Sequence, residues 1–444
     1  MKNTFKFIAP LVLVAFAAVG CTTNGNDPVV QKKFGFVSIG DETDGYSTAH
    51  LDGISKALSD LGLNAGTAGY AKSVGDGAGS KTGAESLIAE GCTLIISNSY
   101  GHQDYMYQLA QTNPNVQFSA ATGDYAWIGK LDNYSNAFNR TFEARYVSGV
   151  VAGKKVKELV EANKLATNNY DKDGNVKIGY VGAFNYAEVV SGYTAFYLGV
   201  KSVYEKVVME VKYTDSWSDV DRESQAAEYL VGNGAVIISQ HADTIGAPSK
   251  VETLLNNGKA CYSVGYNISM ENAAPHAALT SATNDWSVYY KYAIDAANKG
   301  EKIARDWTGG YKEGAVGITN LTSACAAGTA EAVKAAEDAI KAGTLRVFDS
   351  DKYTITGDMV KLNNDNYRFP TLDKAGHVTG YQIDFSYKDW SQGGKVIHEG
   401  PTKEVIKTAN GFTFFDESNP DGGFRSAPYF DLRIDGITEV AYGK

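Results

Sequence analysis

The stretch that decides the fold is residues 34–61, FGFVSIGDETDGYSTAHLDGISKALSDL. Its first six residues, 34–39, are mostly aromatic or β-branched, which predicts a buried strand. Apolar residues from Leu51 to Leu61 then recur at helical spacing, which predicts a helix packed on that strand. The polar loop 40–46 joins the two. The same order of strand, polar loop and helix repeats to about residue 319.

This repetition predicts an α/β fold. Further strand-like runs lie at 93–97, 116–121, 177–182, 208–213, 235–239 and 260–265. Helical patterns separate them, and such alternation is typical of parallel, doubly wound sheets with helices on both faces. There are enough strands for two sheets. Past Phe348 the helical periodicity stops and turn-rich alternating segments follow, so residues 347–444 are expected to form a β-rich extension.

The first residues have the pattern of an export signal. Lys2 and Lys6 precede an apolar run that is too short to span a bilayer, so residues 1–20 are interpreted as a signal peptide. Small residues stand directly before Cys21, as at sites where bacterial lipoproteins are cleaved and acylated. We therefore expect lipidation of Cys21, a flexible tether over 21–32 and a lipid-anchored location on the extracytoplasmic face of the cell membrane. An ordinary cleaved signal is the alternative.

The net charge argues against a nucleic-acid-binding protein, and the cysteine spacing argues against a metal site built on cysteines. The chain has 444 residues and a formal net charge of −10, whereas a nucleic-acid-binding protein is expected to carry a basic surface. Cys92, Cys261 and Cys325 are far apart and lack metal-ligand spacing. Cys92 and Cys261 lie beside apolar runs, which favours buried thiols.

No set of residues has the spacing of a catalytic or metal site. The six histidines are scattered, and no Gly-x-Ser-x-Gly elbow is present. Residues 75–82 nearly match a phosphate-binding loop, but Ser80 replaces the glycine that precedes the lysine. Thr82 and Glu85 also fit a capping box that opens a helix, which is the favoured interpretation. We expect no metal, no cofactor and no enzymatic activity.

The polar loops that follow the strands are the expected ligand site. In open parallel sheets, ligands bind beyond the carboxyl ends of the strands. The loops concerned are 40–46, 98–101, 122–124, 183–185, 214–217, 240–243 and 266–267. They are rich in aromatic, amide and carboxylate side chains, which suit a flat, hydrogen-bonding ligand stacked between rings.

Several of these loops resemble one family of solute-binding lipoproteins. Residues 45–50 (GYSTAH), 121–123 (ATG), 240–243 (QHAD) and 265–270 (GYNISM) are similar to motifs of the basic membrane protein family, in the branch named for a Med-like regulator. The likeness covers about residues 33–348. It implies a type I periplasmic-binding fold and a monomeric receptor that passes a purine nucleoside or purine base to an ABC permease. A ligand-sensing receptor of the same fold and a receptor for another planar solute are alternatives.

The resemblance also implies two lobes that are discontinuous in sequence. Lobe 1 is expected to comprise 33–140 and 268–308, and lobe 2 to comprise 141–267 and 309–346. Three hinge crossings are expected, near Asn139, Asn267 and Gly310.

Ten residues are candidates for ligand binding. Tyr46 and Trp217 come from opposite lobes and are predicted to sandwich a planar base, with core packing as the alternative for each ring. The polar candidates for base edges or ribose hydroxyls are His241, Asp243, Asn267 and Asp124, for which helix or loop caps are the alternative. The remaining candidates are Asn98, Ser99, Tyr100 and Trp286. Tyr46 and Ser269 replace a Trp and an Asp of the branch, so the choice between nucleoside and base stays open.

Overall fold

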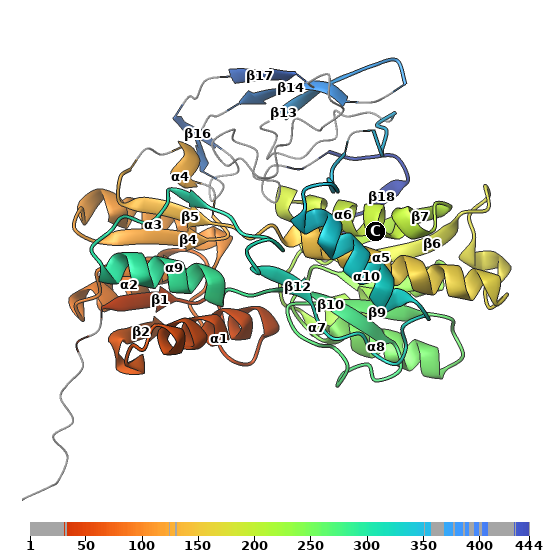
Figure 1. Ribbon diagram of the computed structural model, residues 1–444, viewed down its shortest axis with the longest axis horizontal. Helices are drawn as coiled ribbons and strands as arrows, with labels where there is room; N and C mark the ends of the chain where they lie inside the picture. Colours follow the sequence, from red (N-terminus) through yellow and green to blue (C-terminus); the bar gives the residue numbers. More distant parts are fainter. Residues whose placement is uncertain are drawn as a thin grey trace, which may run out of the picture. The chain divides into compact units, whose positions relative to one another are not determined.

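The computed structural model of the chain is shown in Figure 1. The residues it describes are 31, 33–123, 125–128, 131–349, 351–356, 368–375, 378–384, 387–389, 395–398, 402–406, 430 and 432–443. The predicted signal peptide, Cys21 and Asp124 lie outside the described residues, as does the predicted tether except for Gln31.

The first lobe is built on a six-stranded sheet in which every pairing is parallel. In spatial order its strands are β11 (Asp306–Trp307), β5 (Tyr134–Ala137), β4 (Gln117–Ala121), β3 (Leu94–Ser97), β1 (Phe34–Val37) and β2 (Ala68–Ala71). Phe34 and Phe36 pack toward helices α1 (Gly45–Asp60) and α9 (Ser287–Asn298). Val37 packs on the opposite face, toward α2 (Ala78–Ala89) and α3 (Gln103–Thr112). Both faces are buried, which is why the strands read as continuous apolar runs.

The second lobe is built on a seven-stranded sheet that is parallel except for its edge strand β12. Its order is β12 (Val316–Ile318), β10 (Ala278–Asn284), β9 (Tyr262–Tyr266), β8 (Ile237–Gln240), β6 (Val176–Gly182), β7 (Val207–Tyr213) and β18 (Ile437–Val440). One face is covered by α5 (Thr141–Glu161), α6 (Ala187–Val203) and α10 (Thr329–Lys341). The other is covered by α7 (Val220–Gly232) and α8 (Gly246–Asn256).

Helices α5 and α6 approach each other closely because glycines lie at their contact. A Cβ atom on Gly149 would stand 2.2 Å from the carbonyl oxygen of Phe196, and one on Gly199 would stand 2.0 Å from that of Tyr146. The two helices therefore pack backbone to backbone. This contact fixes where α5 and α6 present the side chains that reach the site described below.

The boundary predicted at residue 268 is wrong. The run Ala278–Asn284, assigned to lobe 1, is strand β10, and it pairs in parallel with β9 of the second sheet. The middle crossing therefore follows Asn284 and leads to α9 of the first lobe, not Asn267. The other passages between the sheets run from β5 to α5 and from β11 to β12. Figure 1 shows α9 among the helices of the first lobe.

The extension predicted for 347–444 is β-rich, but it is not wholly separate from the second lobe. The described part contains a three-stranded sheet and a two-stranded sheet, both antiparallel. Their strands are β13 (Arg368–Leu372), β14 (Val378–Asp384), β17 (Thr402–Ile406), β15 (Tyr387–Asp389) and β16 (Lys395–His398). The described residues at either end of the extension, however, belong to the second lobe. Phe348 and Phe430 are buried in its core, and β18 is the edge strand opposite β12.

Candidate functional site

A pocket of about 440 Å³ is lined by residues of both lobes. The first lobe contributes Ile39, Tyr46, Asn98, Ser99, Tyr100 and Thr122, and the second contributes Glu188, Trp217, His241, Asp243 and Tyr266. Most of these residues follow the carboxyl ends of strands, where ligands of parallel sheets bind.

The pocket brings together seven of the ten candidates. They are Tyr46, Asn98, Ser99, Tyr100, Trp217, His241 and Asp243. Asn267 does not line it, but its Nδ2 donates to Oδ1 of Asp243 at 2.9 Å. Trp286 is only 2% exposed and stacks on His50, with ring centroids 4.2 Å apart, so its ring packs in the core of the first lobe.

Sequence reasoning missed four lining residues, namely Ile39, Thr122, Glu188 and Tyr266. Thr122 and Tyr266 stand in loops that were singled out, and Ile39 directly precedes one. Glu188 lies in the first turn of α6, just beyond the loop 183–185. Its nearness to that loop is the signal that could have found it.

The first-lobe wall is held by hydrogen bonds among its own loops. The Asn98 side chain accepts from the backbone N–H of Ile39 at 2.8 Å and donates to Oγ of Ser38 at 3.1 Å. The Tyr46 hydroxyl donates to the carbonyl oxygen of Asn98. The loops after β1 and β3 are thereby tied to α1, so the ring of Tyr46 is fixed before any ligand arrives.

The second-lobe wall is aromatic. Phe184 stacks on Tyr186 at 5.2 Å and meets Trp217 edge-on at 5.3 Å, both measured between ring centroids. Tyr186 also stacks on Tyr100 of the first lobe at 6.2 Å. Aromatic pairs at these separations are attractive. The Tyr100–Tyr186 pair therefore joins the two lobes beside the pocket.

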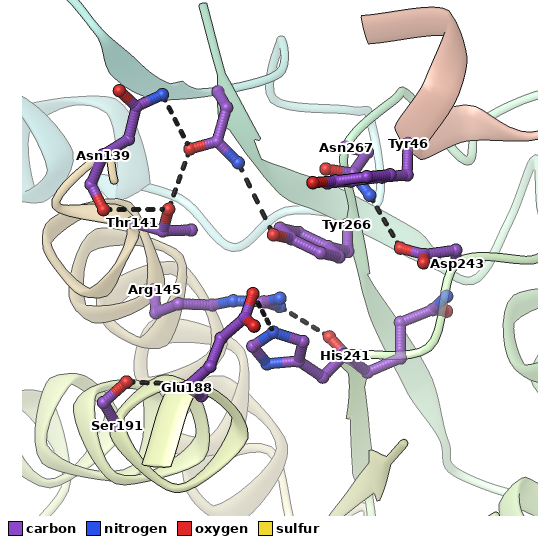
Figure 2. Close-up of polar contacts among 12 residues, drawn as sticks. Tyr46, Asn139, Thr141, Arg145, Glu188, Ser191, His241, Asp243, Tyr266 and Asn267 are labelled. Atoms are coloured by element: carbon purple, nitrogen blue, oxygen red, sulfur yellow. Dashed lines mark hydrogen bonds and ion pairs between the residues drawn. The ribbon is translucent and has the colours of Figure 1, made fainter. Parts of the chain in front are cut away.

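A buried arginine lies behind the pocket (Figure 2). Arg145 of α5 is 0% exposed, and its guanidinium carbon stands 3.7 Å from the ring centroid of Tyr266. Its Nη1 donates to the carbonyl oxygen of Gln240 at 2.5 Å. Its Nε and Nη2 have no hydrogen-bond partner among the described residues. The charge is thus held against the pocket by a cation–π contact and one hydrogen bond.

Burial shifts the titration of the groups that face this arginine. It raises the pKa of Glu188 to about 7, although the charge of Arg145 opposes the shift. Burial and Arg145 together lower the pKa of His241 well below its ordinary value. His241 Nε2 lies 3.6 Å from Glu188 Oε1. The imidazole is therefore neutral at pH 7, and this contact is not an ion pair.

Asp243 is the second acid of the pocket. Burial, with the nearby negative charges of Glu223, Asp44 and Glu188, raises its pKa well above the ordinary value. Among the lining residues that the structure describes, none is a lysine or an arginine. The lining therefore offers hydrogen-bonding acids, a neutral imidazole and aromatic rings to a ligand.

The raised pKa of Glu188 predicts that stability falls as the pH rises. The folded chain holds the proton of Glu188 more tightly than the unfolded chain, in which the pKa of this carboxyl is near 4.5. The stabilisation is therefore full below pH 4.5 and is lost as the pH passes 7. The shift corresponds to about 3 kcal/mol. Chemical unfolding from pH 4.5 to 8 should show Glu188→Gln with a flatter profile than the wild type, and the exposed control Glu331→Gln with an unchanged one. Equal profiles for wild type and Glu188→Gln would contradict this assignment.

The three passages between the lobes come together around the side chains of Asn139 and Asn284. The Oδ1 of Asn284 accepts from Thr141 Oγ1 at 2.8 Å and from Asn139 Nδ2 at 3.2 Å. Asn139 Nδ2 is also 3.2 Å from the carbonyl oxygen of Ala315, which precedes β12. On its other side, Asn284 Nδ2 lies 3.5 Å from the hydroxyl of Tyr266. One polar chain thus runs from the crossings to the pocket.

Three further features of the described residues concern metal ligands, cysteines and membrane spans. Within the described ranges, no group of three or more His, Cys, Asp or Glu side chains is placed to hold a metal ion. Cys92 and Cys261 are buried, as predicted. No helix in these ranges combines the length and the apolarity that a bilayer span requires.

Two parallel-sheet lobes, three crossings and a pocket lined from both sides define the class of type I periplasmic-binding folds. A solved ABC transporter solute-binding protein from Aeropyrum pernix K1 has this fold. It superposes with a TM-score of 0.58 at 16% identity, over 74% of this chain and 94% of that one.

The chain belongs to the PnrA-like family of ABC transporter substrate-binding proteins (Bmp), whose family model matches residues 37–350. This confirms the family predicted from the loop motifs. A purine-binding protein of Brucella abortus (strain 2308) is 30% identical over 296 residues, 66% of this chain and 76% of that protein. A Haloferax volcanii protein named for glucose binding in an ABC transporter is 28% identical over 221 residues, half of each chain.

Proposed function

We propose that this protein captures a purine base or purine nucleoside between its lobes and delivers it to an ABC importer. The observation that carries the proposal is the pairing of Tyr46 and Trp217, which line one pocket from opposite lobes. A planar ring between them would stack on both. The purine-binding relative, at 30% identity, supports the same ligand class.

The polar groups of the pocket suit the edges of a purine or the hydroxyls of a ribose. Asp243, oriented by Asn267, and Glu188, beside neutral His241, each accept hydrogen bonds from N–H or O–H groups. A ligand that lacks an N–H or O–H group at this place would leave a buried acid without a hydrogen-bond partner, which costs about 1–3 kcal/mol. These groups therefore set selectivity, while the rings supply affinity.

The lining also predicts rejection of phosphorylated ligands. A phosphate would have to leave water for a pocket in which no described lining residue is a lysine or an arginine that could pair with its charge. Guanosine monophosphate is therefore expected to bind at least tenfold more weakly than guanosine by calorimetry. Equal affinity for the two would contradict a binding site that offers no cationic side chain to the ligand.

We further propose that the protein works without catalysis on the extracytoplasmic face, held there by lipid on Cys21. The alternatives are a sensor of the same fold and a receptor for another solute, with glucose a specific candidate because of the Haloferax volcanii relative. A sensor would bind the same ligand but hand its closed state to a signalling partner rather than to a permease.

The deciding experiment is a thermal-shift screen of the chain lacking residues 1–20. Adenine, guanine, adenosine, guanosine and glucose are the probes. A ligand at 100 times its Kd adds about 2.7 kcal/mol to the free energy of unfolding. We expect a selective rise in Tm with a purine compound. A rise with glucose and none with any purine would overturn the ligand class while leaving the fold intact.

A further inference from the structure

The described residues 432–443 lie beyond the family match, yet they complete the second lobe. β18 pairs in parallel with β7, placing Ile437 opposite Met209. Just before it, Asp435 accepts from Thr354 Oγ1 at 2.5 Å and from the backbone N–H of Thr356 at 3.0 Å. The chain therefore returns to the lobe beside the point where it left.

A carboxylate on this strand gathers buried hydroxyls of the lobe. Glu439 Oε1 accepts from the Tyr213 hydroxyl at 2.5 Å and from the Tyr193 hydroxyl at 2.8 Å. Its Oε2 lies 3.2 Å from Nε of Arg433. Hydrogen bonds to an ionised group are stronger than neutral ones, so this network is a firm attachment of the segment to β7 and α6.

The network reaches one loop of the ligand pocket. Arg433 Nη2 donates to Oδ1 of Asn185, and the Tyr213 hydroxyl lies 3.3 Å from the same oxygen. Asn185 stands between Phe184 and Tyr186, the two stacked rings of the aromatic wall. Phe184 supports Trp217, which lines the pocket. A path of direct contacts thus runs from the end of the chain to the ligand site.

We propose that Arg433 and Glu439 are positioning residues that hold the loop 183–186 and, through it, the aromatic wall of the pocket. The segment 432–443 then contributes to the geometry of the ligand site and is not a separate appendage of the binding lobe. The effect on affinity rests on the proposed function, whereas the effect on the loop does not.

Two tyrosines provide a matched test. Tyr213→Phe and Tyr193→Phe each remove one hydroxyl from Glu439, but only Tyr213 also contacts Asn185. Hydrogen exchange of the ligand-free full chain should show faster exchange for amides of residues 183–190 in Tyr213→Phe, Arg433→Gln and Glu439→Gln. Tyr193→Phe should leave that loop as in the wild type.

The affinity for guanosine should follow the same division. A lost hydrogen bond is worth about 0.5–1.5 kcal/mol, so the Kd is expected to rise about 2- to 12-fold in Tyr213→Phe and to stay unchanged in Tyr193→Phe. Equal loop exchange in the two tyrosine variants, or wild-type exchange in both Arg433→Gln and Glu439→Gln, would overturn the inference. If the wild type does not bind guanosine, the purine proposal is what is weakened, and the exchange data still decide the positioning role.

Discussion

Replacing Trp217 by alanine is expected to weaken purine binding about 5- to 150-fold. Stacking of a base on an aromatic ring is worth about 1–3 kcal/mol when tested by alanine substitution, and each 1.4 kcal/mol is a factor of ten in Kd. Trp217 is half-buried and lines the pocket, so the loss should fall on ligand affinity more than on stability. Isothermal calorimetry with the purine found by the screen measures the change.

Two controls separate stacking from folding. Trp217→Phe keeps an aromatic face and should recover most of the affinity. Trp286→Phe alters a buried ring of the first lobe, so it should lower Tm while the Kd stays near that of the wild type. Wild-type affinity in Trp217→Ala together with lost affinity in Trp286→Phe would show that the wrong tryptophan has been assigned to the ligand.

Replacing Asn284 by alanine is expected to lower the free energy of unfolding by about 3–5 kcal/mol. The change leaves Thr141 Oγ1 and the Tyr266 hydroxyl without this partner, and Asn139 Nδ2 retains its bond to the carbonyl oxygen of Ala315. Each buried group that loses its partner costs about 1–3 kcal/mol. Denaturant unfolding followed by circular dichroism measures the loss.

Thr141→Val is the matched control because it removes the 2.8 Å bond to Asn284 and a 3.4 Å bond to the carbonyl oxygen of Asn139, but leaves the other bonds of Asn284 in place. Its cost should be about 1–2 kcal/mol, well below that of Asn284→Ala. A double-mutant cycle between Asn284→Ala and Tyr266→Phe should show coupling, since the two side chains share one contact. Strict additivity in that cycle would mean that the crossings and the pocket are energetically independent.

Much of the fold could be predicted because its local signals agree with the final structure. Strand β1 is buried on both faces, and its run of apolar residues predicts this burial. Strand β10 was missed because Ala278–Asn284 contains small and polar residues, ALTSATN, whose burial depends on pairing with β9. Strand β18 has only four residues and weak patterning, so only its partner identifies it.

Part of the site could also be predicted from local signals. The strands show where the loops that follow them lie, so these loops could be taken together as one site. Their residues Tyr46, Trp217, His241 and Asp243 do line one pocket. Arg145 and Glu188 lie within or at the start of helices, where a charged residue usually faces solvent. Arg145 is buried because it packs on Tyr266 and Gln240 of the sheet, and Glu188 lines the pocket. No spacing in the sequence reveals that Asn284 meets Asn139, since 145 residues separate them.

The pairing of β18 with β7 has a consequence for how the chain folds. Lys212 and Ala441, which hydrogen-bond across this pair, are 229 residues apart, so the sheet closes only after a very long loop has formed. Non-local pairings of this kind slow folding. Until β18 pairs with β7, the seven residues of β7 form an unpaired sheet edge with which strands of other chains can pair. Aggregation during refolding should therefore be governed by how fast the end of the chain docks, and a synthetic peptide spanning residues 432–443 should suppress it.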